Sequence, residues 1–499
     1  MKTRLPLNGV DLSRAVDAVF INSPLKNYDL APRLNDFTLP VLGLGYIATY
    51  AQCKGLNVGV LDAESLGLGI SKITQIVNDL KPRWVGLNLL APTYRHSLEI
   101  LCGLNPDIMV MLGGHQAKAM PLEILADRRI PRIDAMILGE AEYRVAAILQ
   151  NTDVRATLPH VRWRDPNRDG MEGHPDPGDK TPWLAPAIDE LPFIDRSYLQ
   201  NDPFPSESGQ LESNLIGSRG CPYDCSFCGA AKSVNPDVTI RTRTPENIVQ
   251  EMKALAERQG VSAFRFVDDL FLASPAFIKK CLPYFCDQGV GQKFVWDATG
   301  RINILGKVPD STLDLLKQSG CREIAVGIES GNQRVLEYMG KRISPDMTAR
   351  CVTRLTARGI NVKGYVILGF PTETITEMNE TVHHIEKLWN ATDDHPGHFR
   401  CSAFEFRPYP GTPEWHRLLK TGKYAADQLL LYEHVDLTNN SRFREMLERD
   451  EFNFSVNLQF GEAPVSLVRQ RLTELMARQK QRFLHVRKSE DHVQRLSMN

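Results

Sequence analysis

RGCPYDCSFCG (residues 219–229) is the stretch of this 499-residue chain from which its architecture can be worked out. Its cysteines, Cys221, Cys225 and Cys228, have C-x3-C-x2-C spacing and directly follow a predicted strand. Three thiolates on one loop suit an iron–sulfur cluster, because the irons of such clusters prefer soft ligands. A structural zinc site needs four ligands, and the next cysteine downstream is Cys281. The spacing therefore predicts a cluster with three protein ligands and one iron left open.

Strands and helices alternate around this loop. From residue 213 to about 410, the predicted strands lie near residues 214–217, 264–268, 294–298, 323–327, 362–368 and 402–406. Six units are too few for the eight-stranded barrel, which takes roughly 250 residues. We expect a partial (β/α)6 barrel over residues 205–412. A mostly helical C-terminal region, residues 413–499, follows it, with a short strand or turn at 452–460.

The first 160 residues form a separate predicted domain. Apolar runs at 16–22, 57–62, 84–90, 108–112 and 133–138 alternate with amphipathic stretches. This α/β pattern predicts a Rossmann-like, doubly wound parallel sheet with helices on both faces. Ligands bind beyond the carboxyl ends of such strands, where this chain has Gly113, Gly114 and Gly139. Residues 161–204, rich in Pro, Gly and Asp, are predicted to be a linker or an exposed hairpin.

Composition excludes several classes of protein. Lys and Arg number 59 and Asp and Glu number 60, so the net charge of −1 gives no general footprint for nucleic acid or an anionic membrane. No run of 18 apolar residues could span a bilayer, and no apolar stretch behind the N-terminus resembles a secretory signal. We therefore expect a cytoplasmic protein whose ten cysteines are not a disulfide framework.

The cysteine motif, with Phe227 before its last cysteine, resembles the signature of radical S-adenosylmethionine (SAM) enzymes. The resemblance implies a [4Fe–4S] cluster on the three cysteines, with SAM chelated to the open iron. SAM is then cleaved reductively to a 5′-deoxyadenosyl radical that abstracts a substrate hydrogen. Phe227 is expected near the adenine of SAM, with core packing as the alternative. Likeness at other strand ends implies SAM contacts from Asp269, Arg301, Glu329 and Ser330; for Arg301 and Glu329 the alternative is a charge pair.

A Rossmann-like domain ahead of such a barrel resembles the cobalamin-binding subclass of this family. LGGHQA (112–117) and ILGEAE (137–142) look like segments of that domain. The resemblance implies that Gly113, Gly114 and His115 contact cobalamin, since glycines let backbone approach a flat macrocycle closely. The chain departs from many cobalamin proteins at residues 60–69, VLDAESLGLG, which lack the Asp-x-His-x-x-Gly motif. Some relatives without that histidine hold cobalamin without a protein imidazole, and others bind none.

Two positions are candidates for catalytic roles. Tyr223, inside the cysteine loop, could handle a proton, or it could simply pack the loop. Glu405 ends the last predicted strand, with Arg407 two positions later. Substrates of such barrels bind at that end; the alternative role for this pair is barrel closure.

The function that this resemblance favours is cobalamin-dependent methylation of carbon in a small intermediate of natural-product (antibiotic) biosynthesis. The electrons would come from an external donor of the flavodoxin or ferredoxin type. The alternative is a cobalamin-free radical SAM enzyme, such as a diol dehydratase of the aminoglycoside type, a cyclase or a rearrangement enzyme. A third hypothesis, a cluster-bearing sensor without turnover, fits the set of SAM-binding segments poorly.

Overall fold

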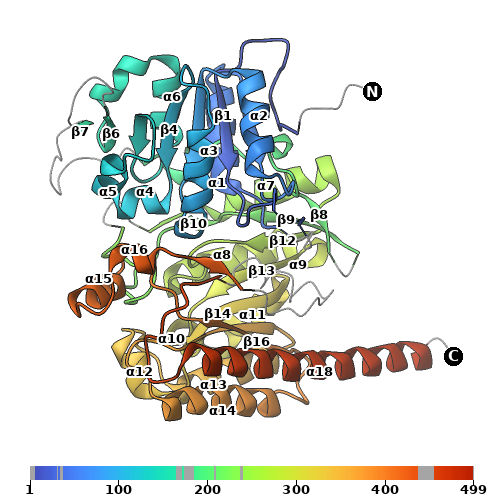
Figure 1. Ribbon diagram of the computed structural model, residues 1–499. Helices are drawn as coiled ribbons and strands as arrows, with labels where there is room; N and C mark the ends of the chain where they lie inside the picture. The colour runs from blue at the N-terminus through green and yellow to red at the C-terminus, as the bar shows by residue number, and fades with distance from the viewer. Residues whose placement is uncertain are drawn as a thin grey trace.

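The computed structural model describes residues 6–30, 32–33, 38–164, 171–173, 185–206, 209–235, 240–435 and 454–497. It contains two seven-stranded sheets, one in the N-terminal domain and one in the barrel (Figure 1). The N-terminal sheet lies over one end of the barrel, and the cysteine loop lies between them, just after the short strand β10 (Ser218–Arg219). Among the described residues, no helix is long and apolar enough to cross a membrane.

The first sheet has the strand order β2-β1-β3-β4-β5-β6-β7. Its parallel strands are β1 (Ala18–Asn22), β2 (Val58–Asp62), β3 (Trp84–Asn88), β4 (Met109–Gly113) and β5 (Ile133–Ile137). These strands are mostly apolar because helices cover both faces of the sheet. The strand order reverses between β1 and β3, which places the expected ligand crevice at their carboxyl ends.

The helices of this domain pack in two layers. One face of the sheet is covered by α1 (Leu42–Cys53) and α6 (Glu142–Gln150), and the other by α2 (Ile70–Leu80) and α3 (Tyr94–Cys102). The short helices α4 (His115–Ala119) and α5 (Pro121–Ala126) follow β4. This arrangement confirms the predicted Rossmann-like sheet. Strands β6 (Val161–Arg164) and β7 (Met171–Gly173) fall in the segment predicted to be a linker or hairpin, and they extend the sheet as an antiparallel hairpin.

The second sheet curls into a partial barrel with the order β16-β15-β14-β13-β12-β9-β8. Six strands are parallel: β9 (Leu211–Leu215), β12 (Ala263–Phe266), β13 (Val295–Gly300), β14 (Cys321–Glu329), β15 (Asn361–Leu368) and β16 (Phe399–Glu405). This confirms the predicted (β/α)6 barrel. The structure adds an antiparallel edge strand, β8 (Phe204–Pro205).

Helices cover the outer face of the barrel, and several of them begin at residues that favour a helix start. They are α7 (Pro245–Gln259), α8 (Pro275–Asp287), α9 (Val290–Lys293), α10 (Ile302–Leu305), α11 (Asp310–Gln318), α12 (Gln333–Tyr338), α13 (Pro345–Thr356) and α14 (Ile375–Ala391). Helices α7, α8 and α13 each begin with a Ser or Thr cap followed by proline. A hydroxyl cap satisfies an amide of the first turn, and proline fits the position after the cap.

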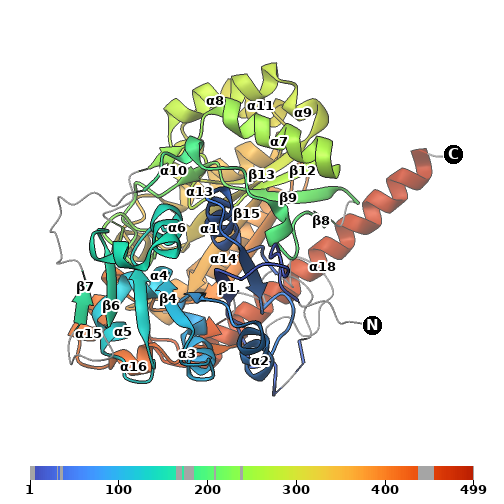
Figure 2. The same ribbon diagram turned by 90° about the horizontal axis from the view of Figure 1, so that it is seen from above.

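The C-terminal region is mostly helical, as expected. It contains α15 (Pro413–Lys420), α16 (Ala426–Leu429) and the long α18 (Val465–Ser497), which lies along β16 and projects beyond the rest of the molecule (Figure 2). A short pair of strands, β17 (Glu433–His434) and β18 (Phe454–Ser455), agrees with the strand or turn expected at 452–460. Residues 452 and 453 lie outside the described residues.

Candidate active site

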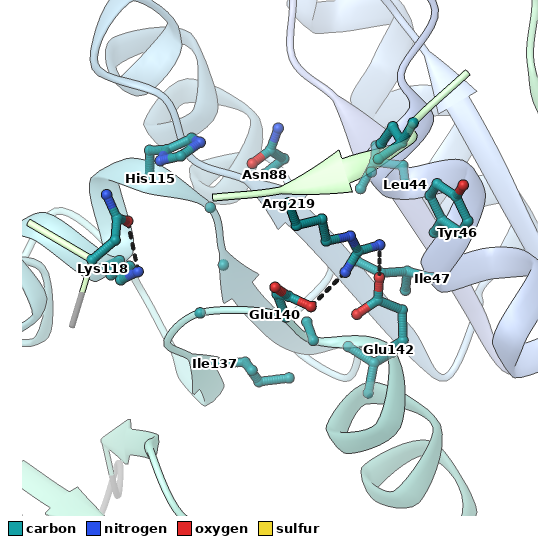
Figure 3. Close-up of a pocket in the computed structure, with 18 of the residues that line it drawn as sticks. Leu44, Tyr46, Ile47, Asn88, His115, Lys118, Ile137, Glu140, Glu142 and Arg219 are labelled. Atoms are coloured by element: carbon teal, nitrogen blue, oxygen red, sulfur yellow. Dashed lines mark hydrogen bonds and ion pairs between the residues drawn. The ribbon is translucent and has the colours of Figure 1, made fainter. Parts of the chain in front are cut away.

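A cavity of about 410 Å³ lies between the carboxyl edge of the first sheet and the cysteine loop (Figure 3). The N-terminal domain contributes the end of β4 and the turn after it, with Gly113, Gly114 and His115, and the turn after β5, with Gly139 and Glu140. The barrel domain contributes residues 219–221 and Asp269. The residues predicted to contact cobalamin and the first cluster cysteine, Cys221, therefore line one space.

Glycines shape the wall of this cavity on the side of the N-terminal domain. Gly114 has a φ of 92°, and a Cβ there would overlap the Asn88 Oδ1 and the backbone of Leu89. Only glycine adopts this left-handed turn without strain. Gly43 on α1 also lines the cavity, and a Cβ added there would meet no atom within 4 Å. The backbone is thus bare where a large flat ligand would lie, which fits cobalamin.

Polar side chains close one side of the cavity. His115 begins α4, and Lys118 on the same helix donates a hydrogen bond to the Asn235 Oδ1 at 2.7 Å. Burial raises the pKa of Asp269, while the charge of His115 opposes this shift. His115 and Asp269 therefore lie on the same cavity, although the sequence placed them in different cofactor sites.

Backbone hydrogen bonds hold the cysteine loop, one within the loop and one to the residue after α12. The Cys228 N–H donates to the Cys225 carbonyl at 3.1 Å, and the Ser226 N–H donates to the Met339 carbonyl at 2.9 Å. Burial raises the pKa of Cys221 and raises that of Cys228 to about 12. Iron binding must therefore displace thiol protons. Three soft donors on one loop fit a cluster in which each thiolate binds a different iron; among the described residues no three ligand side chains converge as they would on one ion.

Arg301 connects the cysteine loop to the barrel. Its Nη1 lies 3.8 Å from the Cys225 Sγ, and its Nη2 donates to the Lys341 carbonyl at 2.7 Å. The guanidinium lies 3.5 Å from the centre of the Tyr223 ring. The Lys341 Nζ in turn pairs with the Glu329 Oε1 at 2.6 Å. The structure thus brings together Tyr223, Arg301 and Glu329, three of the residues predicted from the sequence.

Glu329 has an unusual backbone. It is a buried, non-glycine residue with a φ of 62° at the end of β14. Such conformations cost free energy and persist where the surroundings enforce them, as at many ligand sites. Both the strain and the Lys341 ion pair lie at the carboxyl end of the barrel, where the SAM contact was predicted.

Three predicted residues lie apart from this group. The Ser330 hydroxyl faces α14, 3.0 Å from the Thr381 Oγ1. Phe227 packs edge-on against Phe370, with ring centroids 5.9 Å apart, in an apolar cluster. Glu405 accepts a hydrogen bond from the Ser455 hydroxyl of β18, and its carboxylate pairs with the Arg469 Nε of α18 at 3.2 Å. The structure does not bring Glu405 into the barrel interior, and this placement agrees with the alternative of barrel closure.

The barrel interior holds a second cavity, of about 370 Å³. Charged side chains line part of it: Arg400 and Glu323 form an ion pair at 2.6 Å, and Asp297 is paired at 2.5 Å with Arg322, which lies outside the lining. Tyr365, Phe404 and Arg407 also line it, with the Arg407 guanidinium 5.1 Å from the centre of the Phe404 ring. Val267 and Asp268 line both cavities, so the two are neighbours.

Arg219, which was not predicted from the sequence, joins the two domains at the first cavity. The Arg219 guanidinium binds the Glu140 Oε2 and the Glu142 Oε1, each at 2.6 Å (Figure 3). It also lies 5.2 Å from the centre of the Tyr46 ring. All three charged residues lie in motifs that the sequence analysis singled out: both glutamates belong to ILGEAE, and Arg219 belongs to the cysteine motif. Nothing in the sequence predicts that they form ion pairs with one another.

Comparisons with known proteins agree with this geometry. The profile of the Radical SAM superfamily matches residues 215–385, and that of the B12 binding domain matches residues 36–149. An uncharacterized methyltransferase of Pyrococcus horikoshii is 26% identical over 76% of this chain and 78% of its own length. The cytidylyl-2-hydroxyethylphosphonate methyltransferase of Streptomyces wedmorensis is 27% identical over the same shares. An anaerobic magnesium-protoporphyrin IX monomethyl ester cyclase of Rubrivivax gelatinosus is 25% identical over 70% of this chain and 62% of its own.

Solved structures share the fold. The radical SAM methyltransferase TsrM from Kitasatospora setae, solved with tryptophan and a SAM analogue, superposes with a TM-score of 0.61 at 18% identity, over 81% of this chain and 76% of that one. The cobalamin-dependent SAM radical enzyme OxsB, solved with aqua-cobalamin and SAM, gives 0.59 at 16% identity, over 82% and 61%. At these identities the likeness concerns the fold.

Proposed function

Because this chain carries a radical SAM domain and a B12-binding domain, we propose that it methylates carbon in a small biosynthetic intermediate in a cobalamin-dependent reaction. Its cofactors are a [4Fe–4S] cluster, SAM and cobalamin. Two relatives that match most of the chain are named methyltransferases, which supports methylation over a cobalamin-free dehydration. An external electron donor of the flavodoxin or ferredoxin type completes the proposal.

The observation that carries this proposal is the shared cavity. Gly113, Gly114 and His115 of the B12-binding domain and Cys221 of the cluster loop line the same space. When bound, the cluster supplies the electron that cleaves SAM, and cobalamin carries the methyl group. Two cofactor sites on one cavity allow both to act on one substrate without its release.

The protein's own residues have positioning roles in this proposal. The bare glycine turns accept the macrocycle, and the three cysteines hold the cluster. Arg301 places a positive charge beside Cys225, and with Glu329 it offers polar contacts for the charged methionine end of SAM. The substrate occupies the barrel cavity next to the shared one, where a hydrogen atom is abstracted before methyl transfer.

The test needs no knowledge of the substrate. The cluster is reconstituted without oxygen, hydroxocobalamin is added, unbound cofactor is removed, and iron, sulfide and cobalt are measured. We expect about four irons and about one cobalt per chain, because three cysteines imply one four-iron site. With SAM and a reductant, the cobalamin-loaded protein should form S-adenosylhomocysteine, the remnant of SAM that has given up its methyl group.

The control is the same protein reconstituted without cobalamin. It should form 5′-deoxyadenosine but no S-adenosylhomocysteine. Four irons without retained cobalt, together with 5′-deoxyadenosine alone, would overturn methylation. That result would favour a cobalamin-free reaction, with the N-terminal domain as a scaffold.

A further inference from the structure

An ion-pair group on the wall of the first cavity joins the two cofactor sites. Arg219 lies on β10, two positions before Cys221, and its guanidinium bridges Glu140 and Glu142 of the B12-binding domain. The three side chains are enclosed, with exposures of 14%, 14% and 4%. Charge-assisted hydrogen bonds with two parallel partners are directional and strong. The position of β10, and hence the start of the cysteine loop, is therefore tied to the segment after β5.

The second oxygen of Glu142 points to a ligand. Its Oε2 is buried and, among the residues that the structure describes, has no hydrogen-bond partner. Glu142 lines the cavity in which cobalamin is proposed to bind. A buried carboxylate oxygen without a donor is costly, so a donor is expected from the ligand. The rim of a corrin carries amide side chains, whose N–H groups are such donors.

We propose that Glu142 accepts a hydrogen bond from a rim amide of bound cobalamin and that Arg219 transmits this contact to the cysteine loop. Arg219 is then a positioning residue that couples occupancy of the cobalamin site to the order of the cluster loop. The inference rests on the proposed function.

The neighbouring Arg241 provides a matched control. It is the cross-strand partner of Arg219 on β11 (Arg241–Thr242), and it also binds Glu140. Its other hydrogen bond is to the Pro186 carbonyl at 2.7 Å. Arg241→Gln therefore removes an ion pair from the same group without touching the link between Glu142 and the cysteine loop.

The experiment measures hydrogen exchange of peptides that contain residues 218–229, without oxygen, with and without hydroxocobalamin. Cobalamin affinity is measured in parallel by the visible spectrum. In the wild type and in Arg241→Gln, cobalamin should slow exchange of the loop. Arg219→Gln should still bind cobalamin but lose this protection. Glu142→Gln should bind cobalamin about tenfold more weakly, as for the loss of one hydrogen bond to a charged group.

The outcomes separate this inference from the proposed function. A wild-type protein that retains no cobalamin overturns both. Wild-type protein that binds cobalamin with no change in the loop, or Arg219→Gln with full protection, overturns the coupling alone. If Arg219→Gln does not fold, Arg219→Lys takes its place; it keeps one of the two ion pairs and should show partial protection, and full protection would overturn the coupling.

Discussion

Cys225 is the most enclosed cysteine of the cluster loop, at 6% exposure, and the Arg301 guanidinium lies beside its sulfur. Loss of this one side chain would prevent the loop from holding a cluster. Three ligands leave no spare donor, since the remaining iron must stay open for SAM.

Cys225→Ala should therefore lose the cluster and all SAM cleavage. Iron per chain and 5′-deoxyadenosine are the measurements, after anaerobic reconstitution. Cys53→Ala, at an exposed cysteine that ends α1, is the control and should keep full iron. Continued formation of 5′-deoxyadenosine by Cys225→Ala would contradict the assignment of the loop.

Arg301→Met should make the reduction potential of the cluster more negative, because a positive charge next to the cluster favours its reduced form. Loss of one charge-assisted contact of about 1.4 kcal/mol corresponds to roughly 60 mV for one electron. A redox titration followed by electron paramagnetic resonance measures the shift. Arg95→Met, at an exposed arginine of α3, should leave the potential unchanged. An unchanged potential in Arg301→Met would remove Arg301 from the electrostatics of the site.

Some site residues could be predicted from the sequence, and others could not. The three cysteines could be assigned because their spacing is rare and the chemistry is specific. The direction of the Glu405 side chain could not be predicted. Both faces of a barrel strand are packed, so the direction depends on the register with β15, which the sequence does not give. The pairing of Arg219 with Glu140 and Glu142 spans nearly 80 positions, beyond any local pattern.

At the scale of elements, the turn after β4 shows most clearly how backbone conformation shapes the cavity wall. Gly114, with its positive φ, lets the chain turn at the cavity wall and begin α4 at the next residue. The ends of the strands could be predicted from apolar runs to within a few residues. The antiparallel hairpin β6–β7 was harder to predict, since its sequence is polar and turn-rich like a linker.

Gly114→Ala and Gly43→Ala form a matched pair at this scale. Gly114→Ala should lower the free energy of unfolding by about 1–3 kcal/mol, because the added Cβ is strained and overlaps Asn88. Gly43→Ala should keep or raise stability by up to about 1 kcal/mol, as for glycine replaced in a helix. Both should weaken cobalamin binding. Urea unfolding and cobalamin titration measure the two effects, and a Gly114→Ala protein as stable as the wild type would contradict the turn argument.

At the scale of the whole molecule, the cysteine loop is the meeting point of three regions. Arg219 ties it to the B12-binding domain, Arg301 ties it to the barrel, and the Glu414 N–H of the C-terminal region donates to the Ser226 carbonyl at 2.8 Å. The order of the domains could be predicted from changes in pattern along the chain. Their contacts could not, because they join side chains and backbone groups that lie far apart in the sequence.

The stability of the cluster-free protein should depend on pH through Asp268. This carboxylate accepts hydrogen bonds from the Gly217 and Ser218 N–H groups, and burial raises its pKa to about 7. The unfolded chain releases this proton near pH 4. Between about pH 4 and 7 the folded state binds more protons, so the free energy of unfolding falls as pH rises, by at most about 1.4 kcal/mol per pH unit from this group.

Asp268→Asn should flatten this dependence. Urea unfolding at pH 5 and pH 8 measures the difference, and Asp314→Asn, at an exposed carboxylate of α11, serves as the control. The same slope in Asp268→Asn and the wild type would contradict the assignment to Asp268.

The helix α18 has a consequence for how the chain behaves during synthesis. Strand β16 is an edge of the barrel sheet, and edges of this kind can pair with the strands of another molecule. Gln479 of α18 accepts the Cys401 N–H at 2.5 Å, and Arg469 fastens the same helix to Glu405. Before α18 has been synthesised, β16 lacks these contacts, so chains truncated before Val465 should self-associate and accumulate as aggregates.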